Sequence, residues 1–357
     1  MEIAKIELRG FRSWREASLE LAPGVNIICG GNGRGKTNLL EAVFLLSGLR
    51  SWRTPLRAEL ITHGGEAARI GAQAVSRGRD FEIDMHIPAR GALGVRVNGR
   101  RLETRGALSE VVRCVLFSPE DLELVRGSPA MRRELLDRAL CQLRPRYAQA
   151  LQRYGRVLAS KSRVLRQEDG GGRELLPEYD AQLCTLGAGL LRYRARYVRL
   201  LAEEAAKVQL ELSGGTERLE LGYKTVSTVG DPFAPEAELR QALAAHMAAH
   251  REAELASGRC LSGVHRDDLE ISINGYAARA FASQGQARSC VLALKLAERE
   301  LFRQDMGEYP LLLLDDVLSE LDASRQAYIA GHTPGGQTVI TCCELNAGFA
   351  PDKVIEI

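Results

Sequence analysis

Two segments at opposite ends of this chain carry side chains that can bind phosphate and a metal ion. Residues 30–37 fit the pattern G-x-x-x-x-G-K-[ST], in which backbone N–H groups and a lysine hold phosphate. Residues 311–316 are four leucines followed by Asp315 and Asp316, as expected of an apolar strand that ends in two carboxylates. Such a carboxylate is the usual metal-site partner of a phosphate-binding loop. Both segments are therefore predicted to fold into one nucleotide site, with much of the intervening chain inserted.

The chemistry of these residue types suggests a role for each. Lys36 is expected to reach the β- and γ-phosphates of ATP, and the Thr37 hydroxyl to bind Mg²⁺ together with Asp315. Asp316 is expected to act as a general base or to position water, unless it only caps the strand. The predicted catalytic residues in these segments are therefore Lys36 and Asp316. The predicted phosphate-binding residues are Gly30, Gly31, Asn32, Gly33, Arg34, Gly35, Lys36, Thr37 and Asn38.

A third segment with possible chemistry precedes a predicted helix from Gln286 to Phe302. It contains the sequence Ser283-Gln284-Gly285-Gln286, and a serine hydroxyl with a glycine N–H at a helix start forms an anion site. The segment resembles the signature of ABC-type ATPases, whose signature surface faces the γ-phosphate bound by the other subunit. By that resemblance, Ser283, Gly285 and Gln286 are candidate nucleotide contacts, and Ser283 is a third catalytic candidate. The alternative is an ordinary loop before a helix.

The elements around these segments predict an α/β fold. Residues 2–8 and 25–29 are expected to form strands, and Thr37 to Leu49 a helix, so that strand, glycine loop and helix follow in order. Residues 68–117 alternate as strands do, with an Asn98-Gly99 turn. Further strands are expected at 311–316, 338–342 and 354–357, with a helix near 322–331.

The middle of the chain has a different, helical character. Pro129 to Arg166 is expected to be one helix that Pro145 bends, and Leu175 to Leu212 a second, joined through Gly170-Gly171-Gly172 into a short antiparallel arm. A strand near 217–224, a helix near 235–256 and an Asn274-Gly275 hairpin follow. We therefore predict an ATP-binding head formed by residues 1–116 and 261–357, with a mainly helical second lobe at 117–260.

The charge of the arm is strongly positive, although the net charge of the whole chain is only +2 and indicates no partner. Residues 126–166 hold only Glu134 and Asp137 as acids. Two interpretations stay open: a solvated helix face, or contact with the phosphates of DNA. The opposing basic residues are Arg126, Arg132, Arg133, Arg138, Arg144, Arg146, Arg153, Arg156, Lys161, Arg163 and Arg166.

The cysteines and the hydropathy pattern predict a cytoplasmic protein. None of the eight cysteines forms a C-x-x-C pair, and no Cys/His cluster has zinc-site spacing, which favours buried free thiols in a reducing compartment. The N-terminus alternates like a strand and carries charges, unlike a signal peptide. No apolar run approaches the roughly 20 residues of a membrane span.

Taken together, the motifs resemble the RecF family, short-armed relatives of the SMC-type DNA repair ATPases. The resemblance runs from Phe11-Arg12 and the glycine loop to Ser319-Glu320-Leu321-Asp322, which resembles the D-loop at the dimer interface. It includes residues 117–122 (FSPEDL) and 265–269 (HRDDL). The resemblance implies an ABC-type P-loop ATPase head with mixed sheets, and an ATP-dependent homodimer. It also implies a weak, DNA-dependent ATPase whose slow hydrolysis limits the lifetime of the dimer.

For function, the same resemblance implies DNA binding in recombinational repair and replication restart. It implies action with RecR and RecO to promote RecA loading at single-stranded gaps. Two alternatives remain: an SMC-like structural clamp with incidental hydrolysis, and a transporter ATP-binding subunit. A transporter subunit would have far fewer residues before the signature.

The chain departs from relatives of this type at two positions. SMC relatives carry a glutamine after the strand that ends here at Phe117, where this chain offers Ser118 and Glu120. Many ABC-type ATPases have a histidine after the last core strand, where this chain has Thr341-Cys342-Cys343-Glu344. Thr341 is the candidate to replace that histidine by hydrogen bonding.

Overall fold

The computed structural model describes residues 1–167, 171–343 and 350–357, so Gly170 and Glu344 lie outside the described residues. The chain forms two compact units. The first comprises Met1–Glu123, Lys207–Thr216 and Ser283–Ile357, and the second Leu124–Ala206 and Glu217–Ala282. The head and lobe boundaries expected from the sequence stay a prediction.

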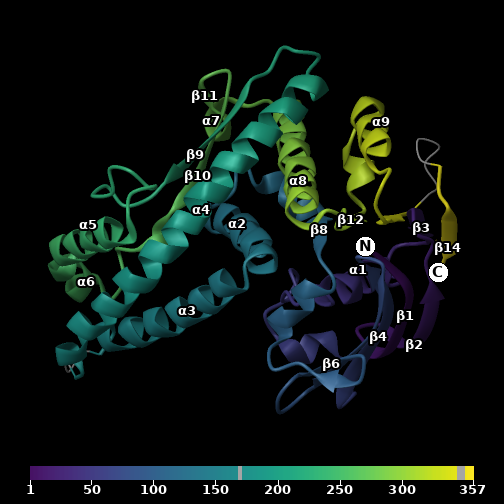
Figure 1. Ribbon diagram of the computed structural model, residues 1–357, viewed down its shortest axis with the longest axis horizontal. Helices are drawn as coiled ribbons and strands as arrows, with labels where there is room; N and C mark the ends of the chain where they lie inside the picture. The colour runs from purple at the N-terminus through teal and green to yellow at the C-terminus, as the bar shows by residue number, and fades with distance from the viewer. Residues whose placement is uncertain (168–170, 344–349) are drawn as a thin grey trace. The chain divides into compact units, whose positions relative to one another are not determined.

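A five-stranded parallel sheet lies at the centre of the first unit (Figure 1). All but one of its strands are mostly apolar and buried, as is typical when both faces of a parallel sheet are covered, whereas the edge strand at 353–356 has no buried residue. The carboxyl ends of the strands share one edge, so the segments that follow them meet there. In spatial order the strands are β14 (Lys353–Glu356), β3 (Val25–Cys29), β13 (Thr338–Cys342), β12 (Leu311–Asp315) and β8 (Cys114–Phe117).

A six-stranded antiparallel sheet forms the second layer of this unit. Its strands alternate between buried and exposed side chains, so one face packs on the core and the other faces solvent. The predicted Asn98-Gly99 turn is present, and both residues have positive φ, as a tight hairpin requires. In spatial order the strands are β2 (Trp14–Glu20), β1 (Glu2–Phe11), β4 (Ala67–Ser76), β5 (Arg79–Pro88), β6 (Gly94–Val97) and β7 (Arg100–Arg101).

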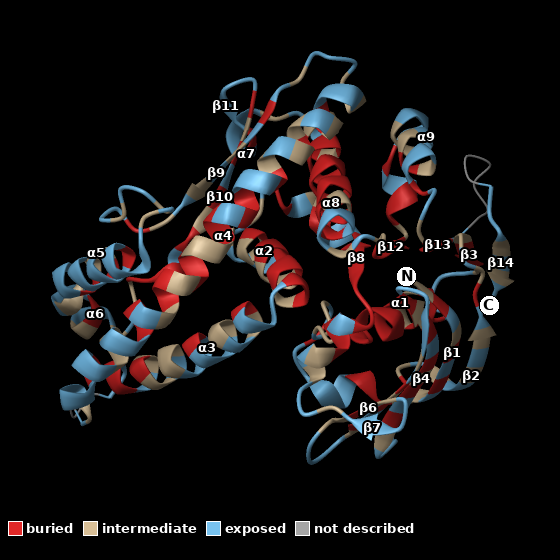
Figure 2. Cartoon of the chain, in the orientation of Figure 1, coloured by how far each residue is buried: buried red, intermediate tan, exposed pale blue. Residues whose placement is uncertain are grey.

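Among the described residues, three α-helices lie wholly within the first unit. Helix α1 (Lys36–Leu45) is buried along most of its length, and Leu39, Val43 and Phe44 join the hydrophobic core cluster that also contains residues of both sheets. Helix α8 (Gln284–Met306) is also mostly buried, as Figure 2 shows. Helix α9 (Ala323–His332) follows β12.

The second unit is helical but also contains a three-stranded sheet (Figure 1). The prediction of one bent helix from Pro129 to Arg166 was wrong, because Pro145 starts a new helix and Arg144 before it is extended. The helix expected near 235–256 is likewise divided at His250. The helices are α2 (Pro129–Leu143), α3 (Pro145–Leu165), α4 (Leu176–Leu212, which continues into the first unit), α5 (Glu236–Ala249), α6 (Arg251–Ser257) and α7 (Ala278–Phe281). The strands are β9 (Leu219–Lys224), β10 (Asp268–Ile273) and β11 (Tyr276–Ala277).

Candidate functional site

The glycine loop connects the end of β3 to the start of α1. Gly33 and Gly35 have φ values of 81° and 99°, which other residues rarely adopt. At Gly35, a Cβ atom would lie 2.7 Å from Ser13 Oγ, so the position also leaves no room for a side chain. In the described part of the chain, the backbone N–H groups of residues 36–38 have no hydrogen-bond partner. This row of free donors at a helix N-terminus is suited to an anion such as phosphate.

The Lys36 side chain is folded over the same loop. Its Nζ donates to the carbonyl oxygens of Gly30 at 2.5 Å and Gly31 at 3.1 Å. The residue is only 7% exposed. A cation is therefore held over the glycine loop, where it would strengthen the binding of an anionic ligand.

The two halves predicted from the sequence meet at Asp315. The Thr37 hydroxyl donates to Asp315 Oδ1 at 2.8 Å, and the Thr341 hydroxyl donates to the same oxygen at 2.9 Å. Burial raises the pKa of Asp315, while the hydrogen bonds from Thr37 and Thr341 oppose that shift. A hydroxyl and a carboxylate so close together are hard oxygen donors of the kind that Mg²⁺ prefers. The donor set at this edge of the sheet thus fits the predicted metal.

Asp316 takes an unusual backbone conformation just after β12. Its φ is 52°, in the left-handed region that aspartate visits more often than most residues. Its N–H donates to the Thr341 hydroxyl at 2.9 Å, and its carbonyl accepts from Ser319 at 2.8 Å. Within the described ranges, its carboxylate accepts no hydrogen bond and is available to water. Thr341 therefore orders both aspartates.

The predicted signature segment caps α8. Ser283 Oγ accepts from the Gln286 N–H at 3.2 Å, and the Gln286 side chain accepts from the Ser283 N–H at 2.9 Å. Gly285 accepts from Arg325 at 2.9 Å. Across the part of the chain that the structure describes, no hydrogen bond joins Ser283, Gly285 or Gln286 to the glycine loop. The structure thus brings Thr37 and Asp315 into contact, and the described hydrogen bonds of the signature segment are within the segment and its helix and to Arg325.

Arg325 is a residue that the sequence analysis missed. Besides Gly285, its guanidinium donates to Ser289 Oγ at 2.9 Å and pairs with the Asp322 carboxylate. One arginine thereby joins the signature helix to the segment that resembles the D-loop. Because Arg325 lies in a helix of ordinary composition, the sequence carried no signal for it.

Two further networks support the loop segments. In the FSPEDL segment, Asp121 accepts from the Ser118 N–H at 2.9 Å and pairs with Lys295 of α8 at 3.0 Å, and both charged side chains are buried. Near α1, Arg12 makes two hydrogen bonds to the fully buried Glu41, at 2.7 and 2.8 Å. An acid in the apolar run of α1 was a signal for this second network. In place of a glutamine, the segment after Phe117 contains Glu120 and the ion pair of Asp121 with Lys295.

The remaining phosphate-loop candidates lie at its periphery. The Asn38 amide donates to Ser13 Oγ at 2.8 Å and accepts from Arg53 at 2.6 Å. Asn32 accepts from the Cys343 thiol at 3.1 Å. The Arg34 side chain is exposed.

The basic residues of the arm fall into two groups. Several are engaged inside the second unit: Arg132 pairs with Asp268 at 2.7 Å, and the buried Lys161 pairs with Glu254 and Asp180. Four arginines on α3 are exposed, and their side chains have no hydrogen bond or ion pair with any described residue: Arg146, Arg153, Arg156 and Arg163. Their spacing of three and seven places these four, the α3 arginine stripe, on one helix face.

The aromatic residues of the arm belong to its core. Tyr147 and Tyr154 are buried, so neither offers a surface for base stacking. Tyr154 bonds His265 Nδ1 at 2.9 Å. Burial lowers the pKa of His265 to about 4. This histidine is therefore a neutral internal group of the second unit.

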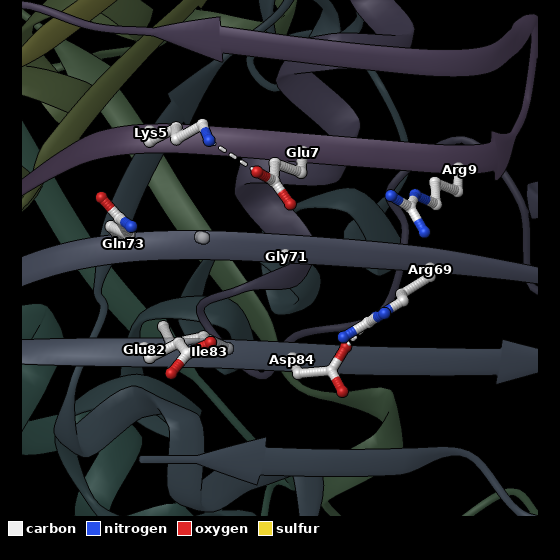
Figure 3. Close-up of a pocket in the computed structure, with 10 residues that line it drawn as sticks. Lys5, Glu7, Arg9, Arg69, Gly71, Gln73, Glu82, Ile83 and Asp84 are labelled. Atoms are coloured by element: carbon white, nitrogen blue, oxygen red, sulfur yellow. Dashed lines mark hydrogen bonds and ion pairs between the residues drawn. The ribbon is translucent and has the colours of Figure 1, made fainter. Parts of the chain in front are cut away.

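A surface hollow of about 130 Å³ lies elsewhere, on the exposed face of the six-stranded sheet (Figure 3). Four of its charged side chains pair with one another, Lys5 with Glu7 at 2.6 Å and Arg69 with Asp84 at 2.6 Å. None of the predicted site residues lines it. We therefore place the candidate nucleotide site at the glycine loop and not in this hollow.

Comparison with known sequences supports the family resemblance that the motifs indicate. The family model described as "RecF/RecN/SMC N terminal domain" matches residues 2–345. A protein of Synechococcus sp. (strain JA-3-3Ab), named DNA replication and repair protein RecF, is 43% identical over 329 residues. The match covers 91% of this chain and 87% of that protein.

Comparison with solved structures agrees with the sequence matches. A structure titled as the recombination mediator protein RecF-ATP in the RecFOR pathway superposes with a TM-score of 0.90 at 33% identity, covering 99% of this chain and 95% of that one. An Smc head bound to the C-winged helix domain of ScpA superposes with a TM-score of 0.55 at 17% identity, covering 96% of this chain and 90% of that one. The predicted fold, an ABC-type head with an inserted helical lobe, is confirmed. No described helix is both long and apolar enough to cross a membrane.

Proposed function

Because this chain belongs to the RecF family of DNA replication and repair proteins, we propose that it is an ATP-dependent DNA-binding protein with a slow, DNA-dependent ATPase. The observation that supports this most is the Thr37–Asp315 contact at 2.8 Å, beside the free N–H groups of the glycine loop. In this proposal Lys36 binds the β- and γ-phosphates of ATP. Residues 30–38 surround the phosphates, and Thr37 and Asp315 hold Mg²⁺.

The hydrolytic step is assigned to residues of this chain. Bound Mg²⁺ would neutralise charge that develops on the phosphates. Asp316, whose carboxylate has no hydrogen-bond partner among the described residues, orients the attacking water and accepts its proton. Thr341 takes the place of the absent histidine, because it already holds Asp315 and the Asp316 backbone.

The working form is proposed to be an ATP-dependent homodimer. Among the described residues the signature segment makes no hydrogen bond to the glycine loop of its own chain, which supports a site that a second copy completes. Ser283, Gly285 and Gln286 would then contact the γ-phosphate bound by the partner. Hydrolysis would separate the copies and so limit the lifetime of the dimer.

Light scattering with and without ATP tests this arrangement. The wild-type chain should dimerise only with ATP, and Ser283→Arg should bind ATP but stay monomeric, because a large side chain would enter the interface. Ser257→Arg, at an exposed position of α6, is the matched control and should dimerise. A Ser283→Arg dimer that persists with ATP would rule out the shared site.

DNA is assigned to the α3 arginine stripe. Four unpaired guanidinium groups on one helix face are suited to successive phosphates of a nucleic acid backbone. In cells we propose that the dimer acts with RecR and RecO at single-stranded gaps and promotes RecA loading there. DNA binding to single-stranded, duplex and gapped substrates, with and without ATP, tests the assignment. Equal binding in both conditions would separate DNA binding from the ATP site.

A further inference from the structure

Three cysteines gather at the base of the glycine loop. Cys29 ends β3 and is the register partner of Cys342 on the adjacent strand β13. The Cys29 thiol donates to the carbonyl oxygen of Cys343 at 3.4 Å. Gly30, the first residue of the loop, donates its N–H to the Cys342 carbonyl at 3.4 Å. The thiols are thus part of the structure that carries the loop.

The three thiols differ in access to solvent. Burial is the main cause that raises the pKa of Cys342 to about 12, which makes it a poor nucleophile. Cys29 is partly covered, whereas Cys343 is exposed. The expectation that the cysteines are buried therefore holds for Cys114, Cys184, Cys290 and Cys342, whereas Cys343, next to the candidate ATP site, is exposed.

The Cys343 sulfur contacts two residues of the loop. It donates to Asn32 Oδ1 at 3.1 Å, and Lys36 Nζ lies 3.6 Å from it. Lys36 is buried and points its ammonium group at this sulfur as well as at the loop carbonyls. Any group attached to the sulfur would therefore start within contact distance of the lysine on which phosphate binding depends.

We propose that Cys343 is a site of reversible S-thiolation by low-molecular-weight disulfides such as oxidised glutathione, and that the adduct excludes ATP from the glycine loop. This inference rests on the proposed ATP binding at that loop. It makes ATP binding depend on the thiol–disulfide balance around the protein, which the proposed ATP and DNA binding do not include.

The chemistry is a thiol–disulfide exchange that needs no other reactant. The Cys343 thiol loses its proton to solvent, and the sulfur attacks one sulfur of the disulfide. A new S–S bond forms as the old one breaks, and the second glutathione leaves as a thiolate that takes up a proton. A small dithiol reverses the reaction by the same exchange.

Two consequences follow from the position of the sulfur. The attached tripeptide occupies space beside Lys36, where the phosphates must bind, and its carboxylates compete for the ammonium group. Conversely, bound ATP covers the sulfur and draws Lys36 to the phosphates. ATP should therefore slow the modification, and the modification should weaken ATP binding.

The test uses the full chain, with oxidised glutathione as the probe. Peptide mass mapping should locate the adduct on Cys343, and saturating ATP should slow its formation at least about fivefold. Calorimetry should show ATP affinity reduced at least about tenfold after modification, a change of about 1.4 kcal/mol, and restored by dithiothreitol. Cys343→Ser should keep its ATP affinity under the same treatment, whereas the matched control Cys260→Ser should lose affinity as the wild type does.

The outcomes separate this inference from the proposed function. If the unmodified protein fails to bind ATP, the proposed function is wrong, and with it the inference. If the unmodified protein binds ATP, an adduct on Cys343 that leaves the affinity unchanged overturns the inference alone. An adduct only at other cysteines, or an internal disulfide in its place, overturns it too. Protection by ATP is measured on the wild type, so the test does not depend on the folding of a variant.

Discussion

The Thr37 hydroxyl donates to Oδ1 of Asp315 over 2.8 Å, although 278 positions separate these residues in the chain. Asp315 ends β12, and Thr37 lies in the first turn of α1, which the glycine loop connects to β3. Both β3 and β12 are neighbours of β13 in the parallel sheet. Parallel strands end at the same edge of a sheet. The glycine loop and the aspartates therefore meet only when β12, which follows the long insertion in the sequence, joins the same sheet as β3. The candidate ATP site is therefore a product of the whole first unit and of neither segment alone.

The first prediction concerns Lys36→Met. Methionine keeps most of the aliphatic length but removes the ammonium group that lies over the glycine loop. ATP affinity should fall at least about 100-fold, since a charge-assisted contact to phosphate is lost. Calorimetry measures the ATP affinity of the variant and of the wild type. Lys353→Met, at a position outside the site, is the control, and near wild-type affinity in Lys36→Met would contradict the assignment.

The second prediction concerns Asp316→Asn. Asparagine has the same shape and also tolerates positive φ, so the turn after β12 should persist. ATP binding and ATP-dependent dimerisation should survive, while hydrolysis should slow about 10²- to 10⁴-fold, because the amide cannot accept the proton of water. Single-turnover hydrolysis measures the step. An unchanged rate would show that Asp316 only shapes the turn.

Local patterns made much of this fold predictable. The strand at 25–29 was predicted with the bounds that β3 has, because a short, mostly apolar run directly before a glycine loop leaves few alternatives. The Asn98-Gly99 and Asn274-Gly275 turns were predictable since only such residues readily take positive φ at both positions. Pro145 shows the limit. Proline marks a helix boundary, but the choice between a bend and a new helix depends on the backbone of the preceding Arg144, which is extended here.

Contacts between distant side chains were not predictable. Lys295 with Asp121 and Arg325 with Gly285 join segments whose separation in sequence says nothing about their distance in space. A buried ion pair also looks like two surface residues in the sequence, because each charged residue is usually exposed. The motifs thus indicated which residues could hold ATP, and only the structure showed what holds those residues.

The third prediction concerns Arg325→Gln. Glutamine cannot reach Gly285, Ser289 and Asp322 at once, so the signature segment and the Asp322 turn would move independently. We expect ATP affinity to stay near wild type and the ATP-dependent dimer to weaken about tenfold. Sedimentation over a range of concentrations measures the dimer, and exposed Arg79→Gln is the control. Equal loss of ATP affinity and dimer would indicate general destabilisation instead of a positioning role.

The fourth prediction concerns the α3 arginine stripe. Reversing Arg153, Arg156 and Arg163 to glutamate should weaken DNA binding and flatten its salt dependence, because each lost phosphate contact reduces the slope of log K against log salt by about 0.7 to 0.9. Fluorescence anisotropy across several salt concentrations measures both. The matched control reverses three exposed arginines elsewhere in the second unit: Arg218, Arg240 and Arg259. Equal losses in the two triple variants would mean that net charge and not the stripe governs binding.

The last prediction concerns stability against pH and the buried His265. Burial lowers its pKa to about 4 in the folded chain, against about 6.5 when exposed. Between these values the unfolded state binds the extra proton, so the free energy of unfolding falls as pH falls through this window. The full effect of this group is about 3 kcal/mol. Nearby Asp267 acts in the opposite direction, because burial raises its pKa to about 6 and the folded state then keeps a proton that the unfolded state releases.

The wild type and the variant His265→Asn both contain Asp267, so the difference between their stabilities reports the protonation of His265 alone. In His265→Asn the amide can still meet the Tyr154 hydroxyl, but it does not titrate. Between pH 7 and pH 4 the wild type should therefore lose about 3 kcal/mol more stability than the variant. Urea unfolding followed by circular dichroism at several pH values measures the difference. Parallel stability curves would show that His265 is protonated as easily in the folded chain as in the unfolded one, and hence that it is not held neutral by burial.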